Sequence, residues 1–253
     1  MSSAKISVKA QIGTNVTIGD FTIIHDNVEI GDDSVIESHC NIGQSFPGSN
    51  GTPLVIGSRS LVRSHSLLYE GSSFGEELET GFSVLIREGT IAGRGMFLGN
   101  HSEIHGVCQI GNYLRTHSEV HISRGSVIED FVWLYPKVQF TNDPFPPSSI
   151  VKGITIKTMA VVCTSTVLMP GITIGTGAFV AAGSLVRKDV PDGQCVEGHP
   201  ARIFGNISTL VSFSQKLRYP WSRNYRKNYP PQAQDLLDDK TALIDDLISQ
   251  LKS

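Results

Sequence analysis

Residues 5–43 read KISVKAQIGTNVTIGDFTIIHDNVEIGDDSVIESHCNIG, with isoleucine at every sixth position from Ile6 to Ile42. A helix repeats its buried face every ~3.6 residues and a strand every ~2 residues, so neither element alone produces this period. A constant short repeat is typical of a solenoid, in which each repeat buries its apolar side by stacking on the next. The sequence therefore predicts a solenoid with any functional site on its outer surface.

The six-residue spacing continues through most of the chain once two insertions are allowed. It runs from Ile56 to Phe140, and after the second insertion from Ile150 to Val186. A second small or apolar residue, such as Ser102, follows four places after each inner position and should also point inward. The other positions of each hexad are largely polar, as expected for a solvated exterior.

This pattern resembles the hexapeptide-repeat acyltransferases, whose fold is a left-handed parallel β-helix with triangular coils. The resemblance covers about residues 4–205 and includes the exit segment Gly198-His199-Pro200-Ala201-Arg202. It implies an all-β solenoid domain over residues 1–207, with insertions at about 44–55 and 141–149. The left-handedness is taken from the family, because the general crossover rule favours the right hand.

Residues 208–253 have a different composition and form the expected C-terminal extension. Their apolar residues recur at helical spacing and predict an amphipathic helix from about 232 to 252. We expect this helix to cap the open end of the solenoid or to pack on a neighbouring subunit. The apolar positions are Leu236, Leu237, Leu243, Ile244, Leu247, Ile248 and Leu251.

Composition and charge narrow the class of protein. A net charge of −3 gives no reason to expect nucleic-acid binding. The chain has neither an apolar run of membrane-spanning length nor an amino-terminal signal pattern, so we expect a cytoplasmic protein with no membrane span. The 4 cysteines are widely spaced and show no metal or disulfide signature.

The second insertion reads TNDPFPPSS over 141–149. It could be a tolerated surface excursion. However, its prolines stiffen the loop, and Asn142 and Asp143 at its root can be held in one direction. We therefore predict a functional role for Asn142 and Asp143.

Coil geometry turns sequence spacing into expected contacts. Residues one full coil apart should lie above one another, separated by the ~4.8 Å of paired strands. At three hexads per coil, Glu103 lies over His121 and His101 over Glu119. A third column contains Arg87, His105, Ser123 and Thr141, and it ends beside Asn142.

A cluster of histidines and glutamates therefore gathers beside the second insertion. It could be a solvated face or a trimer contact. Cross-coil His–Glu pairs also set the orientation and basicity of imidazoles near neutral pH, which favours an active site. The expected catalytic residues are His105, Asn142, Glu103 and His121, and the expected substrate-binding residues are Asp143, His101, Glu119 and Arg87.

Metal binding is the competing explanation for this cluster. The γ-class carbonic anhydrases bind zinc on this same fold, with two histidines five apart and a third from another coil. Here the spacing is four from His101 to His105 and again from His117 to His121. We therefore expect no metal.

Residues 97–148 resemble the acyl-CoA-dependent N-acyltransferases of nucleotide-linked amino sugars. In that family an F-T-N-D-x-x-P-x-S loop follows the catalytic coils. Phe140, Thr141, Asn142 and Asp143 match this motif, with Ser148 or Ser149 near its end, whereas Pro146-Pro147 departs from it. The resemblance implies acyl-CoA as co-substrate and a homotrimer whose active sites lie between subunits.

The resemblance also suggests roles for individual residues. We expect His105 to hydrogen-bond the attacking amine or accept its proton, and Asn142 to orient the amine or the carbonyl. Glu103 and Asp143 would orient His121 and the sugar hydroxyls. The CoA should lie beside the last coils, with contacts from Ala181, Ala182, Gly183, Arg187, Lys188 and Arg202.

The expected function is transfer of an acyl group, with acetyl favoured, from acyl-CoA to the amine of a dTDP- or UDP-linked amino sugar in surface glycan biosynthesis. A CoA-dependent sugar O-acetyltransferase is the main alternative, and it would need a true histidine base. A γ-carbonic-anhydrase-like enzyme and a non-catalytic β-helix protein also remain open. The sequence does not identify the nucleotide or the sugar carbon that bears the amine.

Overall fold

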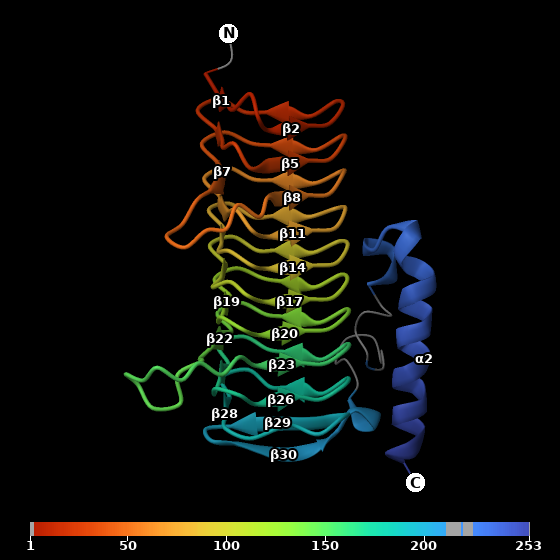
Figure 1. Cartoon of the computed structure of the whole chain (residues 1–253). Coiled ribbons are helices and arrows are strands. Elements are labelled where there is room, and N and C mark those ends of the chain that lie inside the picture. The colour runs from red at the N-terminus through yellow and green to blue at the C-terminus, as the bar shows by residue number, and fades with distance from the viewer. Residues whose placement is uncertain (1–2, 211–218, 220–224, 253) are drawn as a thin grey trace.

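The computed structural model describes residues 3–210, 219 and 225–252, and these form a parallel β-solenoid with a helix beside it (Figure 1). Each coil contributes one short strand to each of three sheets, here called A, B and C. Sheet A contains β1 (Lys5–Ile6), β4 (Ile23–Ile24), β7 (Asn41–Gln44), β10 (Leu67–Tyr69), β13 (Leu85–Ile86), β16 (Glu103–Ile104), β19 (His121–Ile122), β22 (Gln139–Phe140), β25 (Val167–Leu168) and β28 (Leu185–Val186).

Sheets B and C complete the triangular section. Sheet B contains β2 (Gln11–Ile12), β5 (Val28–Ile30), β8 (Leu54–Ile56), β11 (Ser73–Phe74), β14 (Ile91–Ala92), β17 (Gln109–Ile110), β20 (Val127–Ile128), β23 (Thr155–Ile156) and β26 (Thr173–Ile174). Sheet C contains β3 (Thr17–Ile18), β6 (Val35–Ile36), β9 (Leu61–Val62), β12 (Glu79–Thr80), β15 (Phe97–Leu98), β18 (Arg115–Thr116), β21 (Trp133–Leu134), β24 (Val161–Val162), β27 (Phe179–Val180), β29 (Gln194–Gly198) and β30 (Ala201–Asn206). Among these described strands, only β29 and β30 pair antiparallel.

The hexad residues form one continuous core along the solenoid. The inner isoleucines of the middle coils are fully buried, as Ile36, Ile86 and Ile104 show. The second inward positions are buried as well, including the hydroxyls of Ser66 and Ser102, which hydrogen-bond backbone carbonyls of the next coil. The all-β solenoid expected from the repeat is therefore confirmed.

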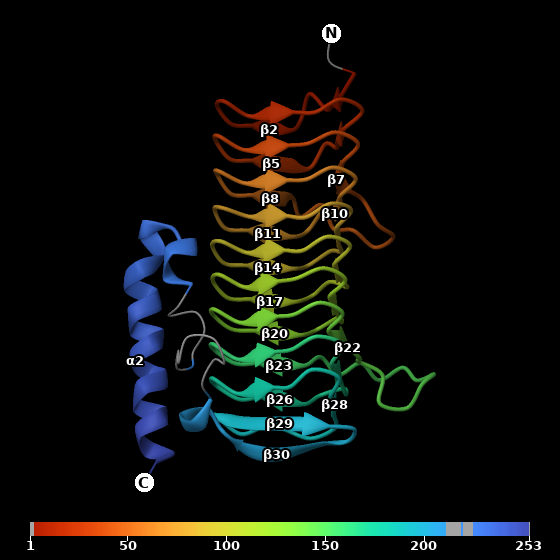
Figure 2. The ribbon, with the colours of Figure 1, turned by 180° about the vertical axis from the view of Figure 1, so that it is seen from behind.

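Both insertions leave the solenoid at the edge where sheet A passes into sheet B, called here the A–B edge. The first lies between β7 and β8 and the second between β22 and β23, and they project on the side opposite the C-terminal helix (Figures 1 and 2). The expectation that Ile150 resumes the inner register was wrong: its side chain is 49% exposed, and burial resumes at Ile154. The second excursion is thus longer than the pattern suggested.

The C-terminal extension packs along the side of its own solenoid. It contains η1 (Ile207–Thr209), η2 (Arg226–Asn228), η3 (Pro231–Ala233) and the helix α2 (Gln234–Gln250). Leu237 and Ile244 of α2 share a second apolar cluster with Phe131, Trp133 and Met159 of the solenoid. The alternative that α2 caps the open end was therefore wrong, because its apolar residues pack on the aromatic outer face of sheet C, where Trp133 lies.

Two further observations bear on composition. No helix among the described residues is both long and apolar enough to cross a membrane. The four cysteines are unpaired; Cys40, Cys108 and Cys195 are buried and Cys163 is half-buried. They serve as packing residues, and burial raises the pKa of the Cys163 thiol to about 11.

Candidate functional site

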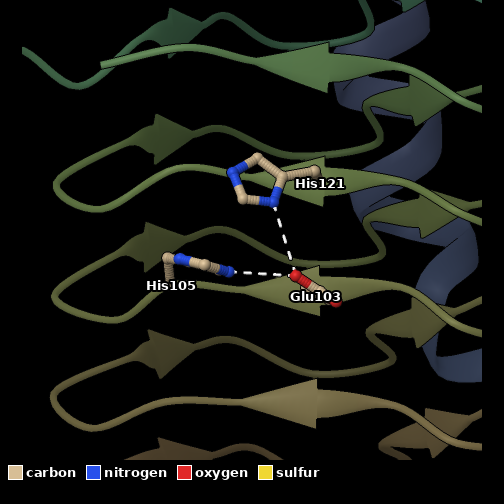
Figure 3. A group of neighbouring side chains, drawn as sticks. All are labelled: Glu103, His105 and His121. Carbon is tan, nitrogen blue, oxygen red and sulfur yellow. Dashed lines mark hydrogen bonds and ion pairs between the residues drawn. The ribbon is translucent and has the colours of Figure 1, made fainter. Parts of the chain in front are cut away.

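Glu103, His105 and His121 meet on the outer face of sheet A at the A–B edge (Figure 3). Glu103 lies on β16 and His121 on β19, and the two are register partners, as expected from coil spacing. The Oε2 atom of Glu103 is 3.0 Å from Nε2 of His105 and 3.6 Å from Nδ1 of His121. The imidazoles are arranged edge to face with 4.3 Å between ring centroids. One carboxylate therefore contacts two imidazoles, all three residues being half-buried.

Electrostatics favour an ionised carboxylate beside neutral imidazole. The hydrogen bond from His105 holds the pKa of Glu103 below its ordinary value, and the adjacent His121 lowers it further. Burial lowers the pKa of His121, and the neighbouring His105 adds to this effect. When His105 donates its Nε2 proton to Glu103, its Nδ1 atom keeps a lone pair. That nitrogen can accept a proton from a substrate.

An ion cluster beside this site was missed by the sequence reasoning. The carboxylate of Glu88, which is almost fully buried, binds Nε of Arg87 at 3.1 Å and Nη1 of Arg124 at 2.9 Å. Arg124 lies two coils from Glu88, and Gly106 occupies the coil between them with a φ of +86°. A side chain at Gly106 would obstruct this bridge. The sequence could have indicated this ion cluster, because Glu88, Gly106 and Arg124 follow one another at intervals of eighteen residues.

Arg87, which we expected to bind substrate, has protein partners for part of its guanidinium. Its guanidinium is held by Glu88 and lies 5.8 Å from the centre of the Tyr69 ring. These contacts fix its position at the A–B edge, one coil from His105. The remaining donors of the guanidinium can still point to a ligand.

Asn142 and Asp143 begin the second insertion. Asp143 folds the loop on itself, because its carboxylate accepts hydrogen bonds from the Ser148 hydroxyl at 2.6 Å and from the Phe145 amide at 2.9 Å. The bond from Ser148 holds its pKa below the ordinary value. Thr141 is two coils from His105 in the same column, a separation of about 10 Å. Asn142 and His105 could thus contact one substrate but not each other.

The second expected His–Glu pair does not form. His101 and Glu119 occupy the edge where sheet C passes into sheet A, and both have a positive φ. The ring of His101 packs against Phe82 with 5.3 Å between centroids, while the Glu119 carboxylate lies 3.9 Å from Lys137. His101 and Glu119 are one coil apart as expected, but their side chains contact Phe82 and Lys137 instead of each other. Their proposed role in substrate binding is therefore separate from the Glu103 cluster.

The residues expected to bind CoA lie around the last coils but on different edges. Ala181, Ala182 and Gly183 precede β28, whereas Arg187 and Lys188 follow it at the A–B edge and are exposed. Arg202 lies on β30 and its guanidinium donates to the backbone carbonyl of Ala201 at 2.9 Å. Of the three basic residues expected to bind CoA, Arg187 and Lys188 therefore lie at the edge that carries His105, and Arg202 does not.

Comparison with known proteins supports the repeat and the fold. The family described as "Bacterial transferase hexapeptide (six repeats)" matches residues 9–44. The UDP-N-acetylglucosamine acyltransferase from Campylobacter jejuni has a similar structure, with a TM-score of 0.50, 17% identity, and coverage of 94% of this chain and 81% of that one. The corresponding enzyme from Bacteroides fragilis 9343 gives a TM-score of 0.52 at 18% identity, covering 93% and 80% of the two chains.

Curated relatives match shorter stretches. A putative acetyltransferase, YvoF, from Bacillus subtilis (strain 168) is 48% identical over 54 residues, which is 21% of this chain and 30% of the relative. A 2,3,4,5-tetrahydropyridine-2,6-dicarboxylate N-acetyltransferase from Staphylococcus aureus (strain JH9) is 28% identical over 102 residues, or 40% of this chain and 37% of the relative. The chain thus spans about a third of the length of these relatives.

These findings define a class of protein: a parallel β-solenoid built from hexapeptide repeats, with a polar cluster on its outer face. The family model covers the repeat at residues 9–44, and the two solved acyltransferases share the fold of this chain.

Proposed function

We propose that this protein is an acyl-CoA-dependent N-acyltransferase that acylates the amine of a nucleotide-linked amino sugar. The observation that carries the proposal is the contact of the Glu103 carboxylate with His105 and His121, at the edge that also carries the Asn142 loop. The acyltransferase names of the matched relatives support the reaction class. The F-T-N-D sequence at 140–143 supports the acceptor class.

The chemistry requires a neutral amine, a positioned thioester and stabilisation of the tetrahedral intermediate. The amine nitrogen attacks the thioester carbon, the new C–N bond forms, and the C–S bond to CoA then breaks. The amine proton passes to Nδ1 of His105, and the departing CoA thiolate then takes that proton from the imidazolium and leaves as the thiol. The Glu103 carboxylate stabilises the imidazolium formed at His105 through the hydrogen bond at Nε2.

The other residues would bind and orient the substrates. In this proposal Asn142 orients the amine or the carbonyl, while Asp143 holds the loop that presents Asn142. Arg187 and Lys188 provide charge for the CoA phosphates. In a homotrimer a second chain would lie against the A–B edge, and His101 and Glu119, at the edge where sheet C passes into sheet A, would face the substrate of a neighbouring chain. The four unpaired cysteines fit a reducing compartment such as the cytoplasm.

A hydroxyl acceptor is the second candidate, and one observation favours it. A hydroxyl is a poor nucleophile without a base, and the Glu103–His105 hydrogen bond is the arrangement that orients an imidazole for this task. A sugar O-acetyltransferase would use the same residues.

One assay distinguishes these functions. Purified protein is incubated with acetyl-CoA and a panel of dTDP- and UDP-linked amino sugars, and thiol release is followed against a blank containing enzyme alone. Matched sugars with a hydroxyl in place of the amine form the second arm. Thiol release only with amino sugars, with the amide identified by mass, supports the N-acyltransferase. Release only with the hydroxyl sugars supports the O-acetyltransferase and rejects the first proposal.

A further inference from the structure

The cluster of Glu103, His105 and His121 also has the geometry of a metal site. Each residue offers one ligand atom, and the three atoms lie within 4.8 Å of one another. In a tetrahedral zinc site, ligands at about 2.0–2.2 Å from the ion are separated from each other by about 3.3–3.6 Å. The Glu103 oxygen is 3.0 Å from the His105 nitrogen and 3.6 Å from the His121 nitrogen. Both distances are close to the ligand–ligand separation of a tetrahedral zinc site, so little movement would be needed to bind an ion.

We propose that Glu103, His105 and His121 form a binding site for a divalent transition metal of the zinc type. The carboxylate Oε2 of Glu103, Nε2 of His105 and Nδ1 of His121 would be the three protein ligands (Figure 3). The ligands come from two neighbouring coils: stacking brings Glu103 and His121 together, and the rotation of its side chain brings His105 to Glu103. All three side chains are half-buried, so water would supply the fourth ligand.

The donor set selects the type of metal. Two imidazoles and one carboxylate suit zinc and its transition-metal neighbours, whereas magnesium and calcium require mainly oxygen ligands. Metal binding also requires deprotonated ligands.

Metal binding and proton transfer require different tautomers of His105. The proposed reaction uses the tautomer with the proton on Nε2, which donates to Glu103 and leaves Nδ1 as the base. A metal takes the Nε2 lone pair, so the proton moves to Nδ1. His105 can then no longer accept the proton of the amine. This inference rests on the proposed function: because bound metal prevents His105 from accepting a proton, the metal would inhibit acyl transfer.

The binding test needs no substrate. Chelator-treated full-length protein is titrated with ZnCl2 by calorimetry, and with CoCl2 by visible absorption, which distinguishes four-coordinate from six-coordinate cobalt. We expect one zinc per chain, a four-coordinate cobalt spectrum, and no heat with MgCl2. Glu103→Gln and His121→Asn should each weaken zinc binding at least ~10-fold.

The matched control is His25→Asn. His25 follows a sheet A strand at the same edge, and its ring bonds Asn41 at 2.7 Å instead of a carboxylate. This variant should bind zinc as the wild type does. Absence of a one-to-one zinc isotherm in the wild type, or equal binding by Glu103→Gln, would overturn the proposal.

The activity arm separates this proposal from the proposed function. Acyl transfer should fall as zinc fills the site and return on addition of EDTA. If zinc binds as described but no acceptor is acylated, the metal site stands and the proposed function fails. If acyl transfer proceeds and zinc does not bind, the metal site alone is rejected.

Discussion

Glu103 and His121 face each other directly across two neighbouring coils, with 3.6 Å between the carboxylate Oε2 and the imidazole Nδ1. Their backbones are paired in a parallel ladder, so the side chains leave the same face of sheet A at the spacing of adjacent strands. His105 completes the group from the turn after β16. The stacking of the coils therefore brings Glu103 and His121 together, and the packed core beneath the strands holds their backbones in place.

Replacing His105 tests its role as the base. His105→Asn removes the proton acceptor while keeping a polar side chain, and we expect kcat to fall about 10- to 100-fold. The KM for acetyl-CoA should change little, because the imidazole acts on the amine. Steady-state kinetics of wild type, His105→Asn and the His25→Asn control measure this effect. Unchanged kcat in His105→Asn would assign the proton to another group, such as the CoA sulfur.

Replacing Asp143 tests the loop that presents Asn142. Asp143→Ala removes the acceptor of hydrogen bonds from Ser148 and Phe145, so the loop should lose its fixed shape. We expect the KM for the acceptor to rise about 10-fold, because the loop would no longer hold Asn142 in one direction. The melting temperature should stay within about 1 °C, because the loop is outside the core.

Ser148→Ala is the milder partner of this variant. It removes only the hydroxyl that donates to Asp143 Oδ1 at 2.6 Å and keeps the backbone bond. Its KM should lie between those of the wild type and Asp143→Ala. A lower melting temperature with unchanged KM would instead make Asp143 a purely structural residue.

The glycine between Glu88 and Arg124 should be intolerant of substitution. In Gly106→Ala the new Cβ would meet the Glu88 carbonyl oxygen at 2.6 Å, at a φ of +86°. We expect a loss of about 1–3 kcal/mol in unfolding free energy, together with reduced acyl transfer as the Arg124 bridge is displaced. Gly48→Ala provides the control, because its φ is +89° with no atom within 4 Å. Equal melting curves for the two variants would contradict a steric role for Gly106.

High pH should detach the C-terminal extension before the solenoid unfolds. Burial raises the pKa of Tyr135 to about 12, and it also raises the pKa of Tyr229, whose hydroxyl accepts from the Trp133 indole at 2.8 Å. A group whose pKa is higher in the folded state stabilises it below its unfolded pKa, about 10 for tyrosine, and this contribution is lost as pH rises through the folded value.

The detachment is measurable because a free helix of this length is marginal in water. Between pH 10 and about 12, the helical circular dichroism of α2 should disappear together with late tyrosine ionisation at 295 nm, while the β signal persists. In Tyr229→Phe one of the late-ionising hydroxyls is absent, so the amplitude of the 295 nm change at this transition should fall. Loss of the β and helical signals in a single step would show that the two parts are not independent.

The sequence alone determined the solenoid, the register and the pairing of Glu103 with His121. In a stacked repeat each residue's vertical neighbour is one coil away, so linear spacing is also spatial spacing. The same arithmetic located Thr141 two coils from His105. The helical spacing of Leu237 and Ile244 likewise indicated α2, because amphipathic periodicity is a local property of the chain.

Only the tertiary structure decided where side chains at the edges point and where the extension docks. His101 and Glu119 are in register, yet one contacts Phe82 and the other approaches Lys137, since corner residues with positive φ diverge from the sheet normal. The approach of His105 to Glu103 depends on side-chain rotation at the end of β16, which repeat spacing does not specify. The position at which α2 docks depends on which sheet carries aromatic side chains, such as Trp133, on its outer face. Contacts set by backbone stacking can be read from a periodic sequence, whereas those set by rotamers and long-range docking require the folded chain.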